Sequence, residues 1–205
     1  MEIIIEYYPN HSLYNLLKDN SKNNTITNTD IQIILIGICR GMDFLHKNNR
    51  IHRDLKNTNV LIDNNGHPRI TGFTSSAYLE EGQKLDAKIG TPLYMAPEVI
   101  KGEYDFSADV YSFAILMYKI LTGKEPIGEE RHAHRHMQQV LDGCRPVIDQ
   151  PIKESFRGVI EKCWSEDTDE RLTFEELFNK FAYDKEYRLD DVDEAKIHSY
   201  VESIK

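Results

Sequence analysis

The chain has 205 residues, of which 40% are hydrophobic, and it carries a formal net charge of −9 with a pI near 5.4. This length suffices for one globular domain with a sizeable core, and the acidic balance argues against nucleic acid or a membrane surface as a partner. Three widely spaced cysteines without C-x-x-C spacing, and no long apolar run, predict a soluble cytoplasmic protein without disulfides or a zinc site.

The first part of the chain predicts a strand followed by helices. Residues 2–5 are a β-branched run typical of a strand. Ser12 is placed to cap a short helix. Thr29 and Gln32 form a capping-box pattern before apolar residues at helical spacing, which predicts a long amphipathic helix that ends at Lys47.

The next part predicts a β-hairpin and a long loop. Residues 60–62 and 69–71 are short apolar runs around 63–66, whose Asp, Asn and Gly residues tolerate turn conformations. Residues 73–98 have no sustained period, and a loop of this length is typically functional.

The second half predicts a helical domain. Residues 107–121 are apolar nearly all round and precede Gly123, which predicts a buried central helix. Further helices are expected at 132–141, 152–164 and 173–181, and the tail after residue 184 is expected to be helical or frayed.

One loop carries a chemical motif. Residues 51–59 read I-H-R-D-L-K-N-T-N, with H-R-D-L-x-x-x-N spacing. Such a loop can place a carboxylate to accept a proton from an attacking hydroxyl, and an amide oxygen to bind Mg²⁺. Because these residue types also make ordinary turn hydrogen bonds, the loop alone leaves a purely structural interpretation open.

With other segments in the same order, this loop resembles the protein kinase family. Residues 90–98 resemble the end of the family's activation segment and close with A-P-E, and residues 109–113 resemble the start of its central helix. Arg171 resembles the arginine near the end of the family's domain, and residues 3–13 resemble its fifth strand and hinge. The resemblance implies a mainly α, kinase-like α+β fold. Residues 1–182 would be the hinge and helical C-terminal lobe with a short hairpin, the N-terminal lobe would be missing, and 183–205 would be an acidic tail.

The resemblance implies catalytic roles within the loop. Asp54 would be the base, Lys56 would steady the transferring phosphate, and Asn59 would bind Mg²⁺ weakly. The lysine favours serine or threonine over tyrosine as the acceptor.

Other roles are also implied. Asp109 would hold His52 and Arg53 in place, Thr91 lies in the implied activation segment, and Glu98 would form a buried ion pair with Arg171.

The implied nucleotide site lies near the N-terminus and the hairpin. Ile5 would be the gatekeeper, backbone groups of Glu6 and Tyr8 would face adenine, and Leu61 would form a floor for ATP.

The sequence departs from the family where a D-F-G motif is expected. Residues 70–74 read I-T-G-F-T, so Gly72 stands in place of the metal-binding aspartate, while Phe73 is kept and is expected to pack beneath His52. Two hypotheses follow. The chain is either a strongly impaired, ATP- and Mg²⁺-dependent kinase of protein serine or threonine, or a pseudokinase that binds signalling partners without phosphoryl transfer.

Overall fold

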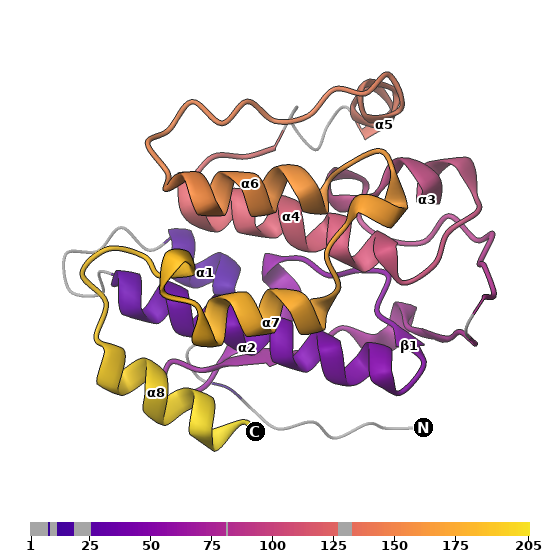
Figure 1. Cartoon of the computed structure of the whole chain (residues 1–205). Helices are drawn as coiled ribbons and strands as arrows, with labels where there is room; N and C mark the ends of the chain where they lie inside the picture. Colours follow the sequence, from indigo (N-terminus) through magenta and orange to yellow (C-terminus); the bar gives the residue numbers. More distant parts are fainter. Residues whose placement is uncertain (1–7, 9–11, 19–25, 81, 127–132) are drawn as a thin grey trace.

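The computed structural model describes residues 8, 12–18, 26–80, 82–126 and 133–205, and its fold is mainly helical (Figure 1). Ile5, Glu6, the strand expected at 2–5 and His132 lie outside these residues. The helices are α1 (Leu13–Lys18), α2 (Asn28–Lys47), α3 (Pro97–Lys101), α4 (Ser107–Thr122), α5 (Ala133–Leu141), α6 (Glu154–Cys163), α7 (Phe174–Tyr183) and α8 (Glu194–Ser203). The strands are β1 (Arg50–Ile51), β2 (Val60–Ile62), β3 (Pro68–Ile70) and β4 (Ala77–Tyr78).

The strands form two small antiparallel sheets. In the first, β2 pairs with β3 through Val60↔Ile70, Leu61↔Arg69 and Ile62↔Pro68, which confirms the expected hairpin with its second strand one residue earlier. In the second, β1 pairs with β4, so the start of the long loop lies beside the strand that leads into the H-R-D motif. The two sheets therefore flank the segment that carries the candidate site.

Helix α2 begins two residues before the position that the sequence pattern predicted. The capping box is formed by Thr27 and Asp30, whose side chain and backbone groups exchange hydrogen bonds at the helix start. Thr29 and Gln32 are buried instead and bind the C-terminal segment. The predicted capping pair was wrong because two overlapping patterns fit the rule, and packing against the tail determines which one caps the helix.

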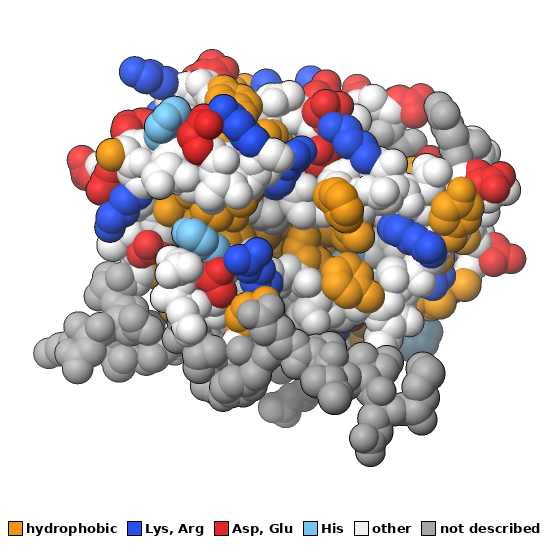
Figure 2. All heavy atoms as spheres, turned by 90° about the horizontal axis from the view of Figure 1, so that it is seen from below, with side chains coloured by type: hydrophobic (Ala, Val, Ile, Leu, Met, Phe, Trp, Pro, Cys, Tyr) orange, Lys and Arg blue, Asp and Glu red, His pale blue; other side chains and the backbone are white. Residues whose placement is uncertain are grey.

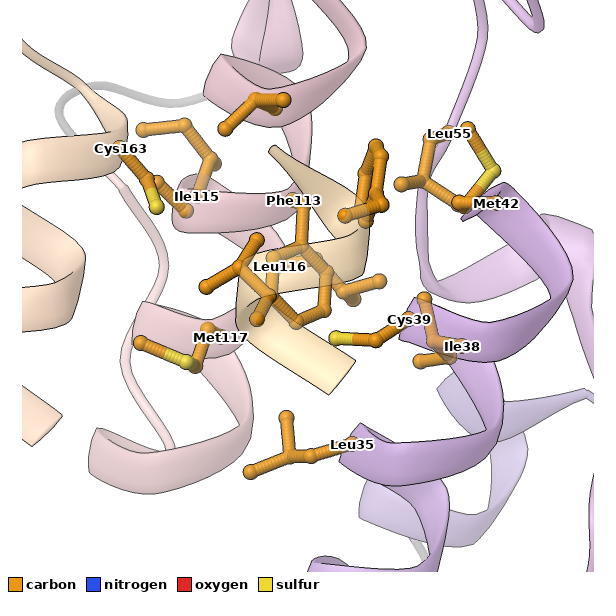
Figure 3. Close-up of a cluster of buried hydrophobic side chains, with 14 of the residues drawn as sticks. Leu35, Ile38, Cys39, Met42, Leu55, Phe113, Ile115, Leu116, Met117 and Cys163 are labelled. Carbon is orange, nitrogen blue, oxygen red and sulfur yellow. The ribbon is translucent and has the colours of Figure 1, made fainter. Parts of the chain in front are cut away.

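The central helix α4 is buried nearly all round, as predicted, and ends at Gly123 in the left-handed conformation. Figure 3 shows Phe113, Leu116 and Met117 of α4 facing Leu35 and Cys39 of α2. Figure 1 shows α2 beside α7, and α4 beside α6, so the core lies between these pairs of helices.

The remaining helices lie close to their predicted positions. Helix α7 is capped by the expected box of Thr173 and Glu176. The segment after residue 184 contains α8, which packs on α2 through buried Ile197, Tyr200 and Val201. Among the described residues, every helix is too short or too polar to serve as a membrane span.

Candidate active site

Asp109, in the first turn of α4, anchors the loop with the H-R-D motif. Its side chain is 1% exposed and accepts hydrogen bonds from the backbone N–H groups of His52 (2.8 Å) and Arg53 (2.9 Å). The ring of His46 bonds the same carboxylate at 2.9 Å. Arg53 has a φ of 66°, a left-handed conformation that costs energy outside glycine and is compensated here by the Asp109 contact.

The electrostatics of this anchor favour the ionised carboxylate. Burial by itself raises the pKa of Asp109, but the hydrogen bond from His46 and the backbone donor of His52 outweigh burial, so the pKa lies below its ordinary value. The loop is therefore held by a buried charge with three hydrogen-bond donors.

Asp54, which follows directly, has both carboxylate oxygens engaged. One oxygen lies 2.9 Å from Lys56 Nζ and accepts from Asn59 Nδ2 at 3.0 Å. The other accepts from the hydroxyl of Thr91 at 2.6 Å, and Lys56 Nζ donates to that hydroxyl at 2.7 Å. The structure thus brings together Asp54, Lys56, Asn59 and Thr91 from two distant segments and fixes the orientation of the carboxylate.

Gly72 and Asn59 lie in direct contact. Gly72 has a φ of 83°, and a Cβ added there would lie 2.5 Å from Cγ, 2.6 Å from Nδ2 and 2.8 Å from Oδ1 of Asn59. The Asn59 amide therefore fills the space in which a side chain at position 72 would begin. It is held there by hydrogen bonds from Nδ2 to the backbone oxygen (2.7 Å) and the carboxylate of Asp54.

The residues present do not fit the Mg²⁺ that the family implies. Position 72 supplies no carboxylate, and Asn59 uses its amide nitrogen to bond Asp54, so its oxygen is the one group of the Gly72–Asn59 pair that could bind a metal. Within the described ranges, His, Cys, Asp and Glu side chains form no group of three or more that could hold a metal ion. A nucleotide-bound Mg²⁺ would find a single amide oxygen where the kinase template supplies an amide and a carboxylate.

Phe73 lies against His52 as expected. The two ring centroids are 5.4 Å apart, and His52 bonds the backbone oxygen of Thr71 through Nε2 at 2.8 Å. Phe73 nevertheless remains 46% exposed, and Arg53 Nε donates to the backbone oxygen of Ser75. The segment after Gly72 is thus held to the loop by the Arg53 side chain, which bonds a backbone oxygen, and by the ring contact with His52, while the Phe73 ring stays partly exposed.

Glu98 and Arg171 form the ion pair that the resemblance implied. Two nitrogens of Arg171 bond the two carboxylate oxygens of Glu98 at 2.5 and 3.0 Å, with side-chain exposures of 1% and 13%. The guanidinium also donates to backbone oxygens of Ser107 and Ser165. This pair ties the end of the long loop to the start of α4 and to the segment before α7.

The nucleotide positions are described in part. Tyr8 is half-buried, while Ile5 and Glu6 lie outside the described residues. Leu61 is half-buried in β2, where it pairs with Arg69 and forms a bridge with Ser12.

The sequence interpretation missed His46. This residue lies four positions after Met42, on the buried face of α2, and its ring contacts Asp109, Phe106 and Phe174. A histidine one turn after the apolar Met42 was the available signal, because a half-buried polar ring needs a partner.

Comparisons with known proteins find relatives among the protein kinases. A family model described as "Protein kinase domain" matches residues 1–181. A dual specificity protein kinase of Dictyostelium discoideum is 38% identical over 146 residues, covering 68% of this chain and 29% of its own length. A serine/threonine-protein kinase of Arabidopsis thaliana is 32% identical over 179 residues, covering 87% of this chain and 31% of its own length.

The chain spans less than a third of the length of these relatives, and only 11% of a longer viral relative from Acanthamoeba polyphaga mimivirus that is 35% identical over 178 residues. The family model nevertheless matches residues 1–181, a range that contains the H-R-D and A-P-E motifs. The chain therefore belongs to the protein kinase domain family.

Proposed function

We propose that this chain is a kinase domain whose transfer of phosphate from ATP to serine or threonine of proteins is strongly impaired. The observation that carries the proposal is Gly72, where the family has a metal-binding aspartate, with the Asn59 amide in the adjacent space. Relatives described as serine/threonine-protein kinases support the substrate class, as does Lys56 beside Asp54.

The size of the impairment follows from the lost charge. In phosphoryl transfer, the metal ions neutralise charge that develops on the phosphate oxygens. Losing a ligand that holds such a metal costs several kcal/mol of transition-state stabilisation, hence about a thousandfold or more in rate. Asp54, Lys56 and Thr91 keep a geometry that could orient a hydroxyl, so the acceptor side of the site is less altered than the metal side.

A phosphotransfer assay tests the proposal. The chain is incubated with labelled ATP, Mg²⁺ or Mn²⁺, and peptides that contain serine or threonine, and Asp54→Asn serves as the control for background. We expect turnover within about tenfold of that control, because the rate is already low. Rapid Mg²⁺-dependent turnover that Asp54→Asn abolishes would overturn the proposal.

A second candidate is a non-catalytic module that binds a protein partner. It is supported by two exposed aromatic rings, Phe44 (66%) and Phe73 (46%), in a hollow of about 350 Å³ between α2, β3 and α8. Figure 2 views the molecule from below Figure 1, on the side of α8, and hydrophobic side chains gather near the middle of this view. The two candidates can be separated by expressing the Asp54→Asn variant in cells that lack the protein. If the protein acts by binding a partner, the variant restores the lost cellular function fully; if it acts by catalysis, the variant does not restore it.

A further inference from the structure

Residues beyond the part that matches the kinase family are built into the fold. The family model ends at residue 181, but the chain continues as a structured segment, residues 184–205, which contains a 3₁₀ turn at Lys185–Tyr187 and helix α8. Arg188 is buried and donates hydrogen bonds to the backbone oxygens of Phe181 and Ala182 at the end of α7. This segment is therefore fastened where it leaves the family-matched part.

Helix α2 holds the segment with buried polar side chains. Gln32 is 0% exposed, and its amide donates to the backbone oxygens of Phe181 (3.1 Å) and Tyr187 (2.9 Å) and accepts from the N–H of Leu189 (3.0 Å). Thr29 accepts from the N–H of Asp193 at 2.8 Å. Because a buried amide without partners is costly, these contacts specify where the segment docks.

Tyr200 of α8 reaches the turn of the β2–β3 hairpin. Its ring centroid lies 4.4 Å from that of His67, next to Pro68 at the start of β3. Gly37 of α2 has no room for a side chain, since a Cβ there would lie 2.1 Å from the Tyr200 hydroxyl and 2.4 Å from Pro68. Three elements, α2, β3 and α8, therefore meet in van der Waals contact at Tyr200.

Strand β3 leads directly into the candidate site. Thr71, the next residue after β3, donates its N–H to the backbone oxygen of Asn59 at 2.9 Å and accepts from His52 at 2.8 Å. Gly72 follows. A contact that holds β3 in place therefore also favours the bonds between Thr71 and the loop with the H-R-D motif.

We propose that residues 184–205 are a positioning element that holds β3, and through it Thr71 and Gly72, against the loop with the H-R-D motif, residues 51–59. Tyr200 is the positioning residue, acting through His67 and Pro68. The inference concerns the conformation of the loop, so it stands whether or not the chain transfers phosphate.

Hydrogen exchange of backbone amides in the full chain tests this. Tyr200→Ala is expected to speed exchange of the Thr71 amide by about tenfold or more relative to amides of α6, since opening of β3 becomes easier while the core stays closed. Tyr200→Phe, which keeps the ring on His67, is expected to retain slow exchange at Thr71.

Two outcomes would overturn the proposal. In one, the Thr71 amide exchanges at the parent rate in Tyr200→Ala; in the other, amides of Thr71 and α6 speed up by the same factor, which indicates a loss of global stability alone. If Tyr200→Ala does not fold, His67→Ala is the alternative variant. It removes the other ring of the same contact, and His67 is only half-buried, so its loss should disturb the core less. It is expected to produce the same selective change at Thr71, and an unchanged rate there would equally overturn the proposal.

Discussion

Placing a side chain at position 72 is expected to destabilise the protein, because the structure has no room for one. A Cβ there would lie 2.5–2.8 Å from three atoms of the Asn59 amide, so Asn59 must turn away and lose its two hydrogen bonds to Asp54. Two such bonds contribute about 1–3 kcal/mol net. A φ of 83° adds about 1 kcal/mol of strain for a residue other than glycine. The expected cost is therefore about 2–4 kcal/mol.

Gly72→Asp and the matched control Gly72→Ala separate this cost from metal binding. Without Mg²⁺, both variants are expected to lose about 2–4 kcal/mol in urea unfolding. With millimolar Mg²⁺ and nucleotide, Gly72→Asp alone is expected to regain stability, since it alone restores a carboxylate. If Gly72→Ala unfolds at the same urea concentration as the parent, a side chain at position 72 does not displace the Asn59 amide, and the expected cost is wrong.

Three further outcomes are expected. Arg171→Met should cost about 3–5 kcal/mol in urea unfolding because Glu98 is left without its buried partner, whereas Lys101→Met, at an exposed 3.8 Å contact, should cost about 1 kcal/mol or less. The lowered pKa of Asp109 means that its ionised form stabilises the fold above about pH 4, and that this contribution is lost as the pH falls through the folded-state pKa. Urea unfolding between pH 6 and 3 should therefore show a smaller acid-induced loss for Asp109→Asn than for the parent. Phe113→Ala should lower the free energy of unfolding by about 3–5 kcal/mol, since this ring is fully buried beside Leu116; a loss below 1 kcal/mol would contradict the described core.

Much of the fold could be predicted from sequence because its signals are local. Helix α4 follows from an apolar run that ends at Gly123, and the β2–β3 hairpin follows from turn residues between two short apolar runs. The start of α2 was predicted wrongly because Thr29 and Gln32 fit the capping rule as well as Thr27 and Asp30 do. Gln32 is buried because of contacts with residues 149 to 157 positions away, which no local pattern reveals.

The same limit applies to the candidate site. The motif spacing predicted which residues surround Asp54, and the resemblance implied the Glu98 pair. Neither the spacing nor the resemblance could predict that the Asn59 amide occupies the space beside Gly72, because a side-chain rotamer depends on which neighbouring atoms are present. Nor could they predict the contact of Tyr200 with the hairpin, which depends on a segment outside the family pattern.

The proposed impairment requires that the Gly72 site, with Asn59 bonded to Asp54, does not bind Mg²⁺ together with ATP. The most direct measurement is the thermal unfolding midpoint of the full chain with ATP, in the presence and absence of Mg²⁺, beside Asn59→Ala. We predict that any ATP-induced increase in the midpoint is the same with and without Mg²⁺. A clear additional increase with Mg²⁺ that disappears in Asn59→Ala would show that the site binds the metal through Asn59 and that the impairment does not come from a lost metal.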